Sequence, residues 1–173
     1  MVHDWFRIEY VGDGVAIAEL SDRTRRRATN VVVPSAIDRL RIVAIGAGAF
    51  AECASLARVV ISEGIVRLGA FAFAGCRALV DVALASTVVE LGRSSFAGCA
   101  SLARVVLPPG VARVEPETFA DCLALTRVAI PSSVVEIGRA AFQNCPSLIL
   151  RVIRGSYAER WAREHCQAYE LVV

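Results

Sequence analysis

The chain has 173 residues, enough for one ordinary domain with a buried core. Hydrophobic residues make up 55% and aromatic residues only 7%, because Ala and Val supply much of the apolar content. All 19 basic residues are Arg, and 17 acidic residues leave a net charge of +2, which does not favour nucleic acid or an anionic membrane surface as partner.

Membrane insertion is not expected, because the longest run without a charged residue is 140–150. A spanning helix needs about 20 consecutive apolar residues. The opening residues Val2–Arg7 do not have the pattern of a signal peptide and suggest folded protein from the start. Together with a cysteine column that is expected to stay unpaired, this predicts a cytoplasmic protein for the sequence as given.

Residues 1–39 are predicted to form an N-terminal cap. Phe6–Tyr10 alternates apolar and polar residues, Gly12–Gly14 turns the chain, and Val15–Ile17 returns, which predicts a β-hairpin. Four arginines within Arg23–Arg27 are expected in a solvated loop, with a phosphate or nucleic-acid contact as the alternative. Val31–Val33 is typical of the strand of a degenerate repeat, with about five residues inserted around 38–42.

Residues 40–154 carry a 23-residue repeat five times, with predicted units 40–62, 63–85, 86–108, 109–131 and 132–154. The unit reads V-x-x-[ILV]-G-x-x-x-F-x-x-C-x-x-L-x-x-V-x-[IL], and its glycine column has one exception, Glu115. The period lies in the range of leucine-rich repeats. Three columns are invariant: Phe50, Phe73, Phe96, Phe119 and Phe142; Cys53, Cys76, Cys99, Cys122 and Cys145; Leu56, Leu79, Leu102, Leu125 and Leu148.

Each unit reads as one coil of a solenoid. Arg104–Leu107 alternates as a half-buried strand, Pro108–Gly110 turns the chain, and Val111–Val114 is a second, shorter extended stretch. The Phe-x-x-Cys-x-x-Leu stretch suits one or two inward-facing turns of helix or 3₁₀-helix. One unit cannot bury its apolar face alone, so we expect an α/β leucine-rich-repeat solenoid of right-handed coils that form a parallel sheet.

The motif F-x-[GDN]-C-x-[SA]-L-x-x-V-x-[IL]-[PSA] resembles the BspA-like leucine-rich-repeat family. Proline ends the strand only at Pro108 and Pro131, a departure from that pattern. The resemblance implies protein–protein interaction or adhesion, often within surface proteins. It therefore implies a secreted or cell-surface location if the chain is part of a longer protein of that type.

Residues 155–173 are predicted to cap the other end. Ser156 and Glu159 form a capping box, and Tyr157, Ala158, Trp161, Ala162 and Cys166 define the apolar face of a helix, with a final strand at 169–173. Arg151 falls in an inward-facing Val column, where a buried unpaired charge is too costly. We therefore expect the fifth strand to slip by one residue, which turns Leu150 and Val152 inward.

The six cysteines suggest disulfides, metal ligands or a nucleophile, but five of them share one repeat column, which predicts packing as small reduced hydrophobes. Zinc would need paired spacings that are absent. His165 and Cys166 are adjacent on the predicted helix and point to different sides, so they do not form a catalytic pair. No cofactor, metal or catalytic residue is expected.

The outward strand positions are the candidate protein-binding face, which predicts a monomeric, non-enzymatic scaffold with a protein or peptide partner. The alternative is polyanion or nucleic-acid binding through Arg23–Arg27 and the arginines of this face. A second outward column, Arg67, Glu90, Arg113 and Glu136, alternates in sign and is expected to pair between coils. The face consists of Arg58, Asp81, Arg104 and Arg127, flanked by Val60, Ala83, Val106 and Ala129.

Overall fold

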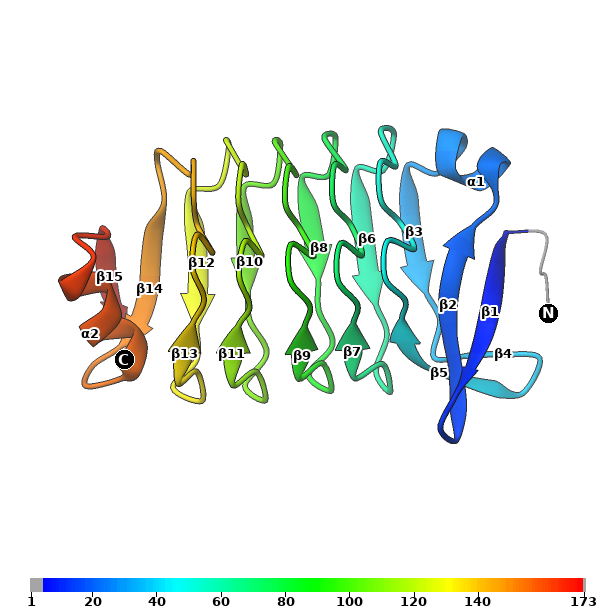
Figure 1. The fold of residues 1–173 in the computed structure, drawn as a ribbon, viewed down its shortest axis with the longest axis horizontal. Coiled ribbons are helices and arrows are strands. Elements are labelled where there is room, and N and C mark those ends of the chain that lie inside the picture. The colour runs from blue at the N-terminus through cyan, green and yellow to red at the C-terminus, as the bar shows by residue number, and fades with distance from the viewer. Residues whose placement is uncertain (1–4, 173) are drawn as a thin grey trace.

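The computed structural model describes residues 5–172, so the expectations for Val2–Asp4 and Val173 lie outside it. The described chain winds into an elongated solenoid, with a β-hairpin at one end and a helix at the other (Figure 1). Each regular coil contributes its predicted strand to one parallel sheet, and its predicted second extended stretch forms a strand of another parallel sheet. No helix among residues 5–172 is long and apolar enough to cross a membrane.

The first sheet carries the candidate face and runs in two pieces, β3-β6-β8 and β10-β12-β14-β15. Its strands are β3 (Asn30–Val33), β6 (Arg58–Ile61), β8 (Asp81–Ala83), β10 (Arg104–Val106), β12 (Arg127–Ile130), β14 (Ile149–Ile153) and β15 (Tyr169–Val172).

The second sheet also runs in two pieces, β1-β2-β5-β7-β9 and β11-β13, with β4 paired to β5. Its strands are β1 (Phe6–Val11), β2 (Gly14–Leu20), β4 (Ala36–Ile37), β5 (Leu40–Ile45), β7 (Arg67–Leu68), β9 (Glu90–Leu91), β11 (Arg113–Val114) and β13 (Glu136–Ile137).

The invariant Phe column forms one continuous stack through the core. Ring centroids of neighbouring coils lie 4.9 Å apart at Phe50–Phe73 and 5.8 Å apart at Phe119–Phe142. The stack ends against Trp161, whose ring meets that of Phe142 edge-on at 6.0 Å. Offset aromatic contacts of this kind add about 0.5–1.5 kcal/mol each beyond the buried area.

The Phe-x-x-Cys-x-x-Leu stretch consists of successive turns and does not continue as a helix. The amides of Cys53 and Leu56 donate to the carbonyls three residues earlier, at 3.4 and 3.1 Å. The amide of Phe50 donates instead to Ala72 of the next coil, at 2.8 Å. Because alternate amides are used between coils, the bond ladder of a helix cannot form.

Both sheets are interrupted at one junction, between the coil of β8 and β9 and the coil of β10 and β11. The turns on the far side stay hydrogen-bonded across this junction, for example from the Phe96 amide to the Thr118 carbonyl at 2.9 Å. The two coils are therefore joined along their turns and separated along their strands.

Glu115 explains this opening. At the glycines of its column, such as Gly92, a Cβ would lie only 2.5 Å from the backbone of the preceding coil. The amide of Gly92 donates to the preceding coil at 2.8 Å, whereas in the described chain no such bond joins the Glu115 amide to Leu91. The Cβ of Glu115 holds the two coils apart.

Proline at the strand end does not cause the interruption. Pro108 and Pro131 occupy the same position in successive coils. The junction that Pro131 faces, between β10 and β12, keeps its parallel register. Pro109 and Pro116 are also peculiar to the coil of β10 and β11, but Glu115 is the one that places a Cβ where the other coils have glycine against the preceding backbone.

The N-terminal cap is the predicted hairpin, with β1 and β2 paired antiparallel. Strand β3 pairs in parallel with β6 at an offset of 28 residues, Asn30 opposite Arg58, which confirms the five-residue insertion relative to the 23-residue period. The insertion folds as a small hairpin of β4 and β5.

The expectation of a loop for the arginine cluster is wrong, because these residues form helix α1 (Asp22–Arg27), with Ser21 as its N-cap. Arg25 donates to the carbonyl of Ala51, which ties the helix to the first regular coil.

The fifth strand slips by one residue, as predicted. Leu150 lies opposite Val128 and Arg151 lies opposite Ala129, so Leu150 and Val152 are fully buried. Arg151 points outward and pairs with Glu170 of β15 at 2.8 Å.

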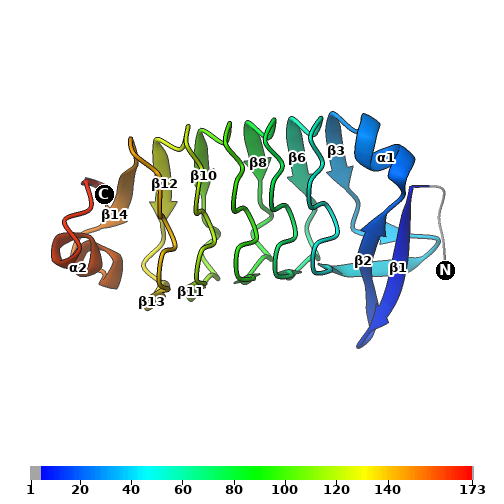
Figure 2. The ribbon, with the colours of Figure 1, turned by 45° about the horizontal axis from the view of Figure 1, so that its top comes forward.

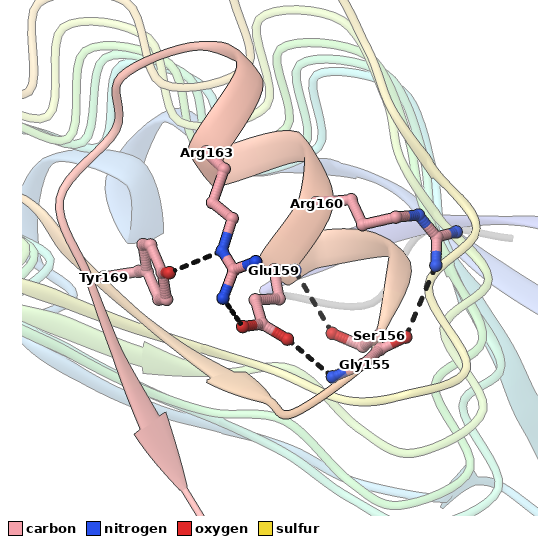
Figure 3. A network of polar contacts seen from close by, with 6 residues as sticks. All are labelled: Gly155, Ser156, Glu159, Arg160, Arg163 and Tyr169. Atoms are coloured by element: carbon pink, nitrogen blue, oxygen red, sulfur yellow. Dashed lines mark hydrogen bonds and ion pairs between the residues drawn. The ribbon is translucent and has the colours of Figure 1, made fainter.

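Helix α2 (Tyr157–Glu164) covers the last coil and is fixed by a polar network (Figure 3). Ser156 accepts from the Glu159 amide at 3.2 Å, and the Glu159 carboxylate binds the Gly155 amide at 2.5 Å and Arg163 at 2.6 Å. A capping box would place the Glu159 carboxylate on the Ser156 amide. That amide already donates to the Ile153 carbonyl, so the carboxylate accepts from the Gly155 amide instead. Cys166 lies beyond the helix and is exposed, so its placement on the apolar face was wrong.

Candidate protein-binding face

The eight residues of the predicted face lie together on the outside of β6, β8, β10 and β12. Seven are exposed and Ala129 is half-buried. Arg58 lies opposite Asp81, and Arg104 lies opposite Arg127, so the charged positions form one row along the starts of the strands. Val60 and Val106 lie two residues further on and are 42% and 68% exposed.

The arginines of this row are not neutralised. In the part of the chain that the structure describes, Arg58, Arg104 and Arg127 make no ion pair, although Asp81 lies among them. The second outward column behaves differently, because Arg67 pairs with Glu90 at 4.0 Å and Arg113 pairs with Glu136 at 3.2 Å, as predicted. The arginines of the first column are therefore available to a partner, whereas Arg67 and Arg113 of the second column are already paired.

The open junction hollows the face between β8 and β10. One hollow of about 330 Å³ is lined by the three arginines, Asp81 and Thr126, among others. A second, of about 410 Å³, continues past Val106 to Pro108 and Pro109. The face thus combines a cationic end with an apolar end, both centred on the junction that Glu115 opens.

The cysteine column is packed in the core, and all six cysteines are free. The thiol of Cys99 donates to the carbonyl of Phe73 at 3.2 Å, and Cys76, Cys122 and Cys145 make the same bond one coil apart. Burial raises the pKa of Cys99 to about 12 and that of Cys145 to about 11. These thiols are therefore protonated and are poor nucleophiles at neutral pH.

No group of three or more His, Cys, Asp or Glu residues between Trp5 and Val172 could hold a metal ion. His165 stacks on Trp161 with ring centroids 4.4 Å apart, and its Nδ1 lies 2.9 Å from the Trp161 carbonyl oxygen. It belongs to the C-terminal cap and lies outside the sheet face.

Residues 27–149 match the model of the BspA type leucine-rich repeat region, in six copies. The chain belongs to the BspA-type leucine-rich-repeat family. Members of this family are repeat scaffolds that commonly take part in protein interaction or are surface proteins. A search of curated proteins found no match.

Solved structures of bacterial leucine-rich-repeat proteins are similar to this chain. A leucine-rich-repeat protein of T. pallidum is 32% identical with a TM-score of 0.81, over 88% of this chain and 71% of that one. A leucine-rich cell surface protein of Faecalibacterium prausnitzii is 33% identical with a TM-score of 0.77, over 90% of this chain but only 39% of that one. The pneumococcal vaccine antigen PcpA, 13% identical with a TM-score of 0.70, shares the fold.

Sequence reasoning placed the face but missed two features of this BspA-type solenoid. The hollow between β8 and β10 depends on Glu115, which was visible only as an exception in a glycine column. A cavity at the N-terminal end, lined by Trp5, Val32 and Arg27 among others, combines segments whose proximity no local pattern indicated.

Proposed function

We propose that this chain is a non-enzymatic protein-binding scaffold that uses the outward face of β6, β8, β10 and β12 for protein–protein interaction or adhesion. The observation that carries the proposal is the row of three unpaired arginines beside exposed valines, around a hollow in an otherwise regular sheet. Arginine is enriched at binding hot spots because its planar fork pairs with carboxylates and stacks on aromatic rings.

The family supports this assignment at a coarser level. Leucine-rich repeats present extended surfaces, and one similar structure is described as a cell surface protein. A cell-surface role for this chain is part of the proposal. Fold likeness alone is a weak argument for function, so the arginine row and the hollow carry the specific site.

The proposal is tested by comparing proteins captured from native extract by three baits. The wild type is compared with the triple variant Arg58→Glu, Arg104→Glu, Arg127→Glu, and with the control Arg67→Glu, Arg113→Glu in the second column. We expect the triple variant to lose proteins that the wild type and the control both retain, with unchanged circular dichroism. Equal capture by the triple variant would contradict the proposal.

The second candidate is polyanion binding, favoured by the position of α1. Helix α1 lies at the same edge of the solenoid as the strand starts that carry the arginine row (Figure 1). Counterion release makes polyanion affinity fall steeply with salt. Capture of nucleic acid or heparin at about 50 mM salt that is lost at about 200 mM salt would favour this candidate. The triple variant should then also fail to capture it.

A further inference from the structure

A groove at the N-terminal end of the solenoid borders the proposed face at β3, the strand that pairs with β6, and has its own chemistry. The hairpin, α1 and β3 lie together at this end of the solenoid (Figures 1 and 2). Residues of all three line this end groove, which has a volume of about 970 Å³. Buried Ile17, Leu20 and Phe50 form its base. Trp5 and Val32 line it with side chains that are 66% and 67% exposed.

One wall of the end groove is an open sheet edge. The second sheet continues past β5 to β2 and β1, whereas the first sheet ends at β3. The carbonyls of Thr29 and Val33 accept from amides of the β6 segment at 3.1 and 3.2 Å. Peptide groups alternate along a strand, so those of Asn30 and Val32 point away from β6 into the groove. Among residues 5–172 no strand pairs with this edge.

The volume of the end groove matches one short strand. A strand residue in a packed sheet occupies about 160 Å³, from a rise of about 3.3 Å, a strand spacing of about 4.8 Å and a sheet spacing of about 10 Å. The groove therefore holds about six residues, comparable with the four-residue β3 that would pair with them.

The charge on the rim selects the occupant. Arg23 and Arg27 lie four residues apart on α1, hence on one side of the helix, and both line the groove. Neither guanidinium group makes an ion pair or hydrogen bond within the described chain, whereas that of Arg25 donates to the carbonyl of Ala51. Two free guanidinium groups beside an apolar groove favour a carboxylate on the occupant.

We propose that the end groove binds an extended peptide segment that adds to β3 as a further strand, buries apolar side chains against Ile17 and Leu20, and carries acidic residues at the end beside α1. Main-chain bonds to Asn30 and Val32 supply sequence-independent affinity, and the apolar wall and the two arginines supply selectivity. This site does not depend on the arginine row of the sheet face.

The test uses a synthetic six-residue peptide that alternates valine and threonine, extended by two glutamates at either end. Its binding is followed by the fluorescence of Trp5, with Trp5→Phe as the check that the signal comes from the groove. The matched variants are Arg23→Glu with Arg27→Glu, and Val32→Pro, which removes an outward amide that edge strands can lose. Val32→Thr is the control.

We expect the acidic peptide to bind, the arginine reversals to weaken it about tenfold or more, and Val32→Pro to abolish binding while Val32→Thr retains it. If Val32→Pro does not fold, the wild type is titrated with two peptides, one N-methylated on the odd-numbered amides and the other on the even-numbered amides. Only alternate amides of an added strand bond to β3, so only one of these two peptides should still bind. The triple variant of the sheet face should bind the peptide normally, which separates this site from the proposed function.

Three results would overturn the proposal. They are absence of peptide binding, equal affinity for a peptide with two lysines in place of the glutamates, and equal binding of both methylated peptides. Concentration-dependent dimers that Val32→Pro dissociates would show that a second copy of the chain occupies the groove, which also contradicts it.

Discussion

Replacing Glu115 by glycine should close the open junction and stabilise the protein. Three bonds between coils are formed at other junctions but are missing here in the described chain, from the amides of Ala103, Ala112 and Glu115. Each contributes about 1 kcal/mol net. A glycine inside extended backbone costs about 0.5–1 kcal/mol. We therefore expect Glu115→Gly to raise the free energy of unfolding by about 2 kcal/mol.

The measurement is equilibrium unfolding in urea followed by circular dichroism, together with hydrogen exchange of the amides at 103, 112 and 115. Protection at these amides should rise together with the unfolding midpoint. The matched control is Glu115→Ala, which keeps the Cβ and should change stability by less than about 0.5 kcal/mol. Equal stabilisation by alanine would refute the steric argument, as would a lower midpoint for the glycine variant.

Other consequences of the same structure can be measured independently. Phe96→Ala should lower the free energy of unfolding by about 3–5 kcal/mol, because Phe96 is fully buried between stacked rings at 5.4 and 5.6 Å; an unchanged urea midpoint would contradict it. The pKa of Cys99 is raised from 9.0 to about 12, because the buried thiol stays neutral in the folded protein. Its contribution to stability is fully present below pH 9.0 and is lost as the pH rises toward about 12. Stability should therefore fall over that range and fall less in Cys99→Ala, and an equal pH slope in both proteins would argue against a buried neutral thiol. Deleting residues 155–173 should remove α2 and β15 and leave β14 as an open edge, so sedimentation should detect oligomers or aggregates. A truncated monomer of unchanged stability would rule out the capping role.

The repeat predicted most of the fold because its columns report stacking directly. Phe, Cys and Leu at a constant spacing must lie above one another once coils stack, and the structure confirms this. The slip at Arg151 was also predictable, because an uncompensated charge in a Val column costs more than a shift of register. The pairing of Arg67 with Glu90 followed from the same stacking.

Features that depend on close approach between coils were not predictable. The sequence marks Glu115 as an exception, but only the structure shows that a Cβ in this column meets the backbone of the coil before it. Helix α1 was not predicted because it has six residues and no buried side chain, so its sequence has no apolar periodicity that indicates a helix. The end groove exists because the two sheets end at different strands, which is a property of the whole cap.

The most direct test of the binding face is hydrogen exchange of the complex with a partner that the wild type captures and the triple arginine variant loses. If that partner docks on the sheet face, binding should protect amides of β6, β8, β10 and β12 and leave β7, β9, β11 and β13 unchanged. Protection confined to the second sheet or to the two ends of the solenoid would contradict the proposed face.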